Sequence, residues 1–139
     1  TSMYGSPNAE HKPYKITSES IEKNDSSGKL IEFPLMVTTF LGKKIPASGG
    51  FYLRTLPTKV IKDSFKNYQN ENMPGSFYIH SWELTPEFMP KLDLPFKDKF
   101  VTYHNLNKAY SRMSELLEIF EFTSFSRYIT ENKMDVNLI

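Results

Sequence analysis

The chain has 139 residues, which suffice for one ordinary domain but not for two well-packed ones. Its 17 basic and 16 acidic residues give a net charge of +1, which excludes the basic field of a nucleic-acid-binding surface. The sequence holds no cysteine for disulfides or thiolate zinc sites, and no apolar run approaches the roughly 20 residues of a membrane-spanning helix.

The chain divides into three parts by composition. Residues 1–28 contain few apolar side chains and read as an extended segment that ends in a turn. Residues 29–129 hold the periodic segments and form the main domain, and residues 130–139 read as a frayed tail. The first residues lack the charged-then-apolar order of a signal peptide.

The first half of the main domain predicts short strands. Residues 30–40 are strand-like, but Pro34 cannot donate to a strand ladder, so we expect one or two short strands there. A compact turn over 41–46 follows. Gly49 and Gly50 then allow a positive φ or a close approach of another group to the backbone.

Two helical patterns follow. Thr55 can cap a helix that has Pro57 in its first turn and continues to about Asn70, with one apolar face. That face consists of Val60, Ile61, Phe65 and Tyr68. A proline-spaced loop spans 84–96, and a second long helix starts near Asn105 or Asn107 and is expected to cover a sheet face. A short helix over 122–129 completes an α/β fold.

The segment Phe77–Glu83 is the most informative stretch of the chain. It is aromatic and β-branched, so it predicts a strand, and residues 47–83 then read as strand, helix, strand with a parallel crossover. Alternation places Tyr78, His80 and Trp82 on one face. This histidine either belongs to an aromatic, sugar-lined pocket or is hydrogen-bonded to a backbone carbonyl inside a core.

The sequence lacks the motifs of several other kinds of site, which leaves a histidine that could act as a general acid or base. His11, His80 and His104 are isolated from one another, so no metal-binding spacing occurs. No Gly-x-Ser-x-Gly elbow or phosphate-binding glycine loop is present. His80, at the end of a predicted strand, remains as a general acid or base.

Two blocks with their spacing resemble one bacterial family. Gly49 to Pro57 reads Gly-Gly-Phe-Tyr-Leu-Arg-Thr-Leu-Pro, and Phe77 to Leu84 reads Phe-Tyr-Ile-His-Ser-Trp-Glu-Leu. They resemble the C-terminal part of NodB-type polysaccharide deacetylases, carbohydrate esterase family four, in the subgroup found with exopolysaccharide gene clusters. Phe51 and Ser81 depart from the usual glycine and proline of that pattern.

The resemblance implies the C-terminal portion of a distorted (β/α) barrel that hydrolyses N-acetyl groups of amino-sugar polymers. His80 matches the family's general acid, which protonates the departing amine. The resemblance places the divalent, zinc-like metal and the catalytic base upstream of this sequence, so no metal ligand and no cofactor site is expected within this chain. The chain alone is therefore expected to be inactive.

Other residues of the two blocks are assigned with their structural alternatives. Tyr52, Arg54 and Trp82 are expected to contact substrate, although Tyr52 and Trp82 could serve packing and Arg54 could form an ion pair. Glu83 is expected to support the site by orienting His80 or by binding backbone amides. Gly49 and Gly50 are expected to support the same site.

The expected partners are N-acetylated polysaccharide and either the missing barrel half or a second copy. Unpaired strand edges of a partial barrel invite such association. The alternative function is a non-catalytic module that binds polysaccharide or protein. The compartment stays open between bacterial cytoplasm and periplasm or cell envelope, because absence of cysteine fits either.

Overall fold

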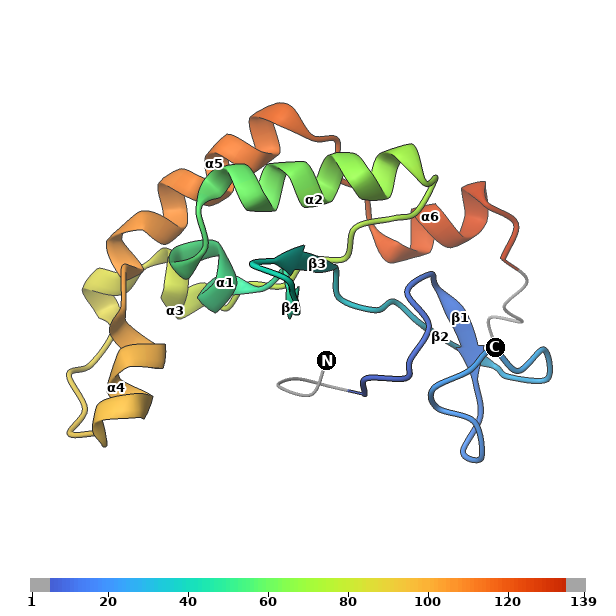
Figure 1. Ribbon diagram of the computed structural model, residues 1–139, viewed down its shortest axis with the longest axis horizontal. Helices are drawn as coiled ribbons and strands as arrows, with labels where there is room; N and C mark the ends of the chain where they lie inside the picture. Colours follow the sequence, from blue (N-terminus) through green and yellow to red (C-terminus); the bar gives the residue numbers. More distant parts are fainter. Residues whose placement is uncertain (1–5, 135–139) are drawn as a thin grey trace.

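The computed structural model describes residues 6–134 as a mixed α/β fold without a closed barrel (Figure 1). Its strands are β1 Tyr14–Ile16, β2 Leu30–Glu32, β3 Val37–Phe40 and β4 Lys43–Pro46. Its α-helices are α1 Gly50–Thr55, α2 Thr58–Asn70, α3 Ser81–Leu84, α4 Phe96–Tyr103, α5 Ala109–Ile119 and α6 Phe125–Glu131. Short 3₁₀ turns cover Pro86–Phe88 and Leu106–Lys108. The expected α/β class is therefore confirmed.

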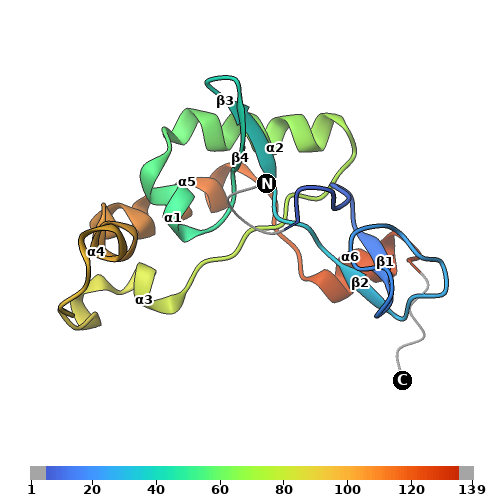
Figure 2. The same ribbon diagram turned by 60° about the horizontal axis from the view of Figure 1, so that its bottom comes forward.

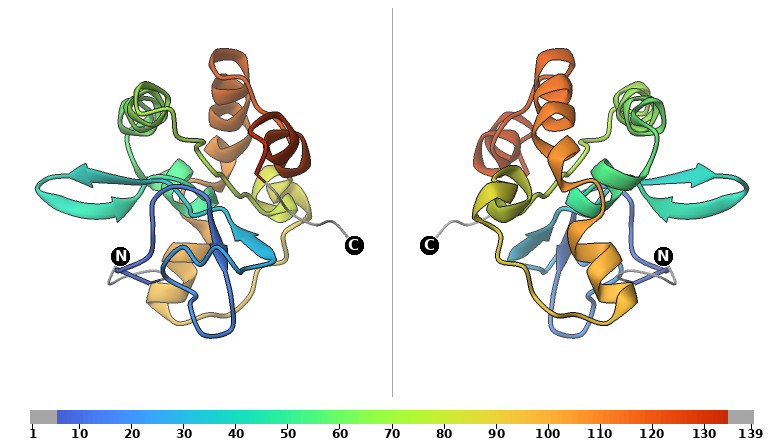
Figure 3. Two further views of the ribbon diagram at one scale, coloured as in Figure 1. Left: turned by 90° about the vertical axis from the view of Figure 1, so that its right-hand side faces the viewer. Right: turned by 90° about the vertical axis from the view of Figure 1, so that its left-hand side faces the viewer.

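The strands form two antiparallel hairpins. β1 pairs with β2, with Tyr14 opposite Glu32, and β3 pairs with β4, with Val37 opposite Pro46. The β3–β4 hairpin protrudes from the body in Figure 3. Pro34 separates β2 from β3 as expected, but β4 replaces the predicted turn. The turn is confined to Leu41 and Gly42, both with positive φ.

The helices surround the middle of the molecule. α2 and α5 lie along one side, with α1 and α3 beneath them (Figure 1). An ion pair between Lys62 and Glu115 links α2 to α5. α4 lies at one end, and the β1–β2 hairpin lies with α6 at the other (Figure 2).

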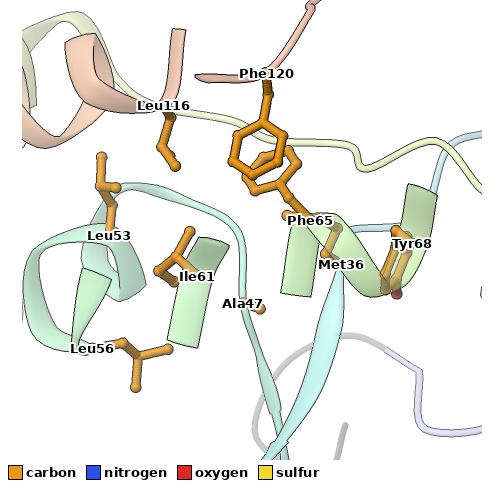
Figure 4. Close-up of a cluster of buried hydrophobic side chains, with 9 residues drawn as sticks. All are labelled: Met36, Ala47, Leu53, Leu56, Ile61, Phe65, Tyr68, Leu116 and Phe120. Carbon is orange, nitrogen blue, oxygen red and sulfur yellow. The ribbon is translucent and has the colours of Figure 1, made fainter. Parts of the chain in front are cut away.

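The hydrophobic core forms where α1, α2 and α5 meet the base of the β3–β4 hairpin (Figure 4). The predicted apolar face of α2 is confirmed, because Ile61, Phe65 and Tyr68 are buried. The Phe65 and Phe120 rings stack with centroids 4.7 Å apart. The cluster consists of Met36, Ala47, Leu53, Leu56, Ile61, Phe65, Tyr68, Leu116 and Phe120.

The predicted strand over 77–83 is wrong. Within residues 6–134, the one isolated parallel bridge here joins Leu35 to Ser76, just before the segment, and helix α3 begins at Ser81. The Glu83 carboxylate accepts a hydrogen bond from the His80 backbone N–H and so helps to start that helix. This local capping interaction ends the extended backbone at His80.

The strand, helix, strand order over 47–83 is also wrong. Helix α1 begins at Gly50, where a strand was predicted, and buries Leu53 and Arg54. Thr55 ends α1 instead of capping α2, and its hydroxyl donates to the Phe51 carbonyl. Pro57 is the N-cap of α2. Burial of Leu53 and Arg54 therefore outweighs the β propensity of the aromatic run.

Three further expectations change near the C-terminus. Helix α4 was not predicted. It has no buried residue and its large apolar side chains are exposed, so its sequence lacks the apolar face of a packed helix. The second long helix starts at Ala109 after a 3₁₀ turn and packs on α1 and α3 instead of covering a sheet. The short terminal helix is confirmed as α6, but it includes residues 130–131 of the predicted frayed tail. Residues 1–5 and 135–139, which include the end of that tail, lie outside the described residues.

Adjacent leucines in α5 test the position of the core. Leu116 is fully buried, whereas Leu117 is 54% exposed. We expect Leu116→Ala to lower the free energy of unfolding by about 2–5 kcal/mol, because it removes buried methyl groups and leaves a cavity. Leu117→Ala should cost less than about 1 kcal/mol. Urea denaturation followed by circular dichroism measures both, and equal losses would contradict this core.

Candidate functional site

The site is an exposed histidine between two aromatic side chains. His80 lies at the N-cap of α3, and 52% of its side chain is exposed. Its ring is stacked with Trp82, with centroids 5.4 Å apart, and meets Tyr78 edge-on at 5.3 Å. The three side chains predicted to share one face therefore do lie together, although a helix and not a strand supplies Trp82.

Glu83 contacts both the ring and the backbone of His80. Its carboxylate is only 2% exposed, and Oε2 lies 3.1 Å from the His80 Nδ1 and 3.1 Å from the backbone nitrogen of the same residue. One carboxylate oxygen thus contacts both the ring and the main chain of His80. The expected contact between these residues is present, and it combines both of the roles considered for Glu83.

Arg54 lies behind Glu83 and is itself 1% exposed. Its Nε and Nη2 each lie 3.0 Å from Glu83 Oε1. The same guanidinium donates to the carbonyls of Val101 at 3.0 Å and Thr102 at 3.5 Å, and to that of His104. Burial and these acceptors favour the ion-pair alternative for Arg54 over a substrate contact. It links α1, α3 and the C-terminal end of α4.

Two glycines make room for this arrangement. Gly49 has φ +100°, a conformation that side chains disfavour, and a Cβ there would lie 2.8 Å from the Tyr78 ring. A Cβ on Gly50 would lie 1.9 Å from Glu83 Oε2. The Glu83 carboxylate therefore occupies the space of a side chain at residue 50, so the two sequence blocks are in direct contact.

The remaining predicted site residues have mixed placements. Trp82 is half-buried, stacks on His80 and has the Arg54 guanidinium 6.0 Å from its ring, so it both packs and presents a surface. Tyr52 is half-buried in α1, where it packs against the core and contacts the Phe51 ring. The structure thus brings Trp82 to the His80 ring.

The sequence did not reveal the aromatic neighbours of Arg54. The Phe51 ring centroid lies 5.9 Å from the guanidinium carbon, and Phe51 in turn meets Phe100 at 6.3 Å. The Phe100 ring stacks on His104 at 4.4 Å. Phe51 was noted only as a departure from a glycine pattern, and no local signal relates residue 100 to residue 51 across the intervening chain.

Metal ligands do not gather in the described part of the chain. Among residues 6–134, no three His, Cys, Asp or Glu side chains are placed to hold a metal ion. His104 Nε2 contacts the Asn105 amide at 2.8 Å, and His11 Nε2 lies 3.5 Å from Lys44 Nζ. No helix within this range is long and apolar enough to cross a membrane.

Substitution of Gly50 tests the packing beneath His80. We expect Gly50→Ala to lower the free energy of unfolding by about 1–3 kcal/mol or more, because the new methyl group displaces the Glu83 carboxylate. The matched control is Ser48→Ala, since Ser48 is fully buried and its hydroxyl has no hydrogen-bond partner among residues 6–134. The control should be neutral or stabilising. Urea denaturation that left both variants equal to the parent would contradict the packing described.

Comparison with known proteins gives one family. The family described as a domain of unknown function, DUF3473, matches residues 1–130. No curated protein and no solved structure matches the chain. The match covers nearly the whole sequence, including the block from Gly49 to Pro57 and the block from Phe77 to Leu84. The chain therefore belongs to the DUF3473 family, which is associated with the C-terminal region of polysaccharide deacetylases.

Proposed function

We propose that this chain is the C-terminal portion of a metal-dependent, NodB-type polysaccharide deacetylase and that His80 is its general acid. The observation that supports this most is the exposed His80 ring, held from below by the buried Glu83. The family association with polysaccharide deacetylases gives the reaction class. The aromatic side chains beside His80 suit a sugar substrate.

The chemistry needs an acid at the nitrogen of the substrate. Hydrolysis of an N-acetyl group joins a water oxygen to the acetyl carbon and breaks the bond between that carbon and nitrogen. The departing amine nitrogen must gain a proton as this bond breaks. An imidazole can hold and donate a proton near neutral pH, so His80 can supply it. The products are acetate and a free amino sugar.

The remaining catalytic groups are assigned to sequence outside this chain. The described residues do not provide a metal site, so the divalent, zinc-like metal and the catalytic base would have to be bound elsewhere in the complete enzyme. A general acid alone typically accelerates a reaction only about 10²- to 10⁴-fold, so the 139-residue chain should show no measurable deacetylation by itself.

The surface near His80 supports association with the rest of such an enzyme. Among residues 6–134, the one β-bridge beside the extended segment that leads to His80 joins Ser76 to Leu35. Large apolar side chains are also exposed along 88–101. They are Phe88, Leu92, Phe96, Phe100 and Val101. Exposed apolar patches and incompletely paired strands are typical of interaction surfaces, so we propose that the barrel half, or a second copy, covers them.

A non-catalytic binding module is the second candidate. The stacked His80 and Trp82 rings, with Tyr78 beside them, form a small aromatic surface that could hold a saccharide without reacting with it. This function needs no metal and no base. It differs from the first in predicting binding without acetate release, whatever sequence is added to the chain.

Removal of the imidazole tests the catalytic proposal. In the polypeptide that joins this chain to its metal-binding half, we expect His80→Ala to lower kcat on N-acetylglucosamine oligomers by about 10²- to 10⁴-fold. His104→Ala, a histidine whose ring packs on Phe100, is the control and should retain activity. Acetate release measures both. Unchanged kcat for His80→Ala, or clear turnover by the 139-residue chain with added zinc, would contradict the proposal.

Binding of saccharide to the aromatic surface can be measured separately. Trp82 is the single tryptophan of the chain, so its fluorescence reports directly on this surface. Titration with N-acetylglucosamine oligomers should change the emission, and Tyr78→Ala should weaken binding about three- to tenfold through loss of one aromatic contact. Tyr110→Ala, which alters an exposed tyrosine of α5, should not. Binding by the joined polypeptide without acetate release would favour the binding module.

A further inference from the structure

We propose that Glu83 is a positioning residue that fixes the proton of His80 on Nδ1 and thereby makes Nε2 the nitrogen that faces the substrate. This inference rests on the proposed role of His80 as an acid. It adds which nitrogen donates, which residue imposes that choice, and which residues hold Glu83 in place. The sequence pattern suggested only that Glu83 orients His80 or binds backbone amides.

The two oxygens of Glu83 have separate partners. Oε1 faces Arg54, with Nε and Nη2 both at 3.0 Å. Oε2 faces His80, with Nδ1 at 3.1 Å. An ionised carboxylate can only accept hydrogen bonds, so the contact at Oε2 requires a proton on Nδ1. In the neutral ring, Nε2 then carries the lone pair.

Arg54 keeps the carboxylate in this acceptor role. The pair is almost completely excluded from water, and a buried carboxylate without a cation would be costly. The guanidinium is held in turn by backbone carbonyls at the end of α4 and cannot swing away without losing them. The Glu83 carboxylate already packs against Gly50, where a Cβ would lie only 1.9 Å from Oε2, so it cannot move further in that direction. The carboxylate is therefore fixed on both sides.

The consequence for the reaction is directional. When the ring is doubly protonated, the Nδ1 proton stays hydrogen-bonded to Glu83, and the Nε2 proton is the one transferred to the departing amine. After transfer, the ring is neutral with its remaining proton on Nδ1, which is the form that Glu83 stabilises. A residue that merely capped α3 through the His80 backbone N–H would not impose this preference.

The tautomer of His80 can be measured in the 139-residue chain itself. Nitrogen NMR on the ¹⁵N-labelled chain, at a pH where the imidazoles are neutral, distinguishes protonated from bare ring nitrogens. The His80 signals are assigned by their loss in His80→Asn. Because hydrogen bonds to charged groups are strong, we expect the Nδ1–H form to exceed the Nε2–H form by about tenfold or more. A predominant Nε2–H form would overturn the inference without any variant of Glu83.

A conservative variant tests the cause. Glu83→Asp keeps the negative charge for Arg54 but withdraws the carboxylate from His80, so we expect the tautomer preference to fall several-fold. In the joined polypeptide, kcat should fall about tenfold with KM little changed. Glu87→Asp makes the same chemical change at an exposed position four residues away and should alter neither. Urea denaturation confirms that each variant is folded.

The two proposals fail separately. An unchanged tautomer ratio in folded Glu83→Asp would overturn the positioning role, even if His80→Ala abolished deacetylation. Full activity of His80→Ala would refute the catalytic role of the ring, while the tautomer ratio would still report whether Glu83 fixes its proton. Back-mutation of Glu83→Asp to Glu83 should return both the tautomer ratio and kcat to the parent values.

Discussion

The buried ion pair between Arg54 and Glu83 is the interaction on which the rest of this structure depends. Burying two charges removes hydration worth several kcal/mol for each ion, and this is recovered only when every donor and acceptor finds a partner. Here the guanidinium contacts the carboxylate and three backbone carbonyls, and its carbon lies 5.9 Å from the Phe51 ring centroid and 6.0 Å from that of Trp82. The pair thereby joins α1, α3 and the end of α4, which are distant in sequence.

The same pair links the fold to the candidate site. Its anionic member reaches past Arg54 to the His80 ring, and the lack of a side chain on Gly50 provides the space for its carboxylate. The Glu83 carboxylate therefore takes part both in the buried ion pair and in the contact with the His80 ring. The histidine itself remains half exposed, as a group that meets a substrate must, while the residues that orient it are almost fully buried.

The position of His80 also bears on what the chain can do alone. It lies at the end of an extended segment that belongs to neither of the described hairpins. In the proposed enzyme, the surface beside His80 would meet the part that supplies the metal and base. In that proposal, this chain contributes the oriented histidine, and the other groups belong to the rest of the enzyme.

The sequence by itself determined the α/β class, the apolar face of α2, the break at Pro34 and the grouping of His80 with Tyr78 and Trp82, because these follow from local periodicity and from residue chemistry. Only the tertiary structure decided that the aromatic run at Gly50–Thr55 is helical and that the backbone turns into a helix after His80. It also decided that Arg54 is buried and not at a substrate rim. These outcomes depend on long-range partners: a carboxylate 29 residues away and carbonyls at the end of α4. Local propensity cannot encode contacts of that kind, since their free energy exists only once the distant segments have packed together.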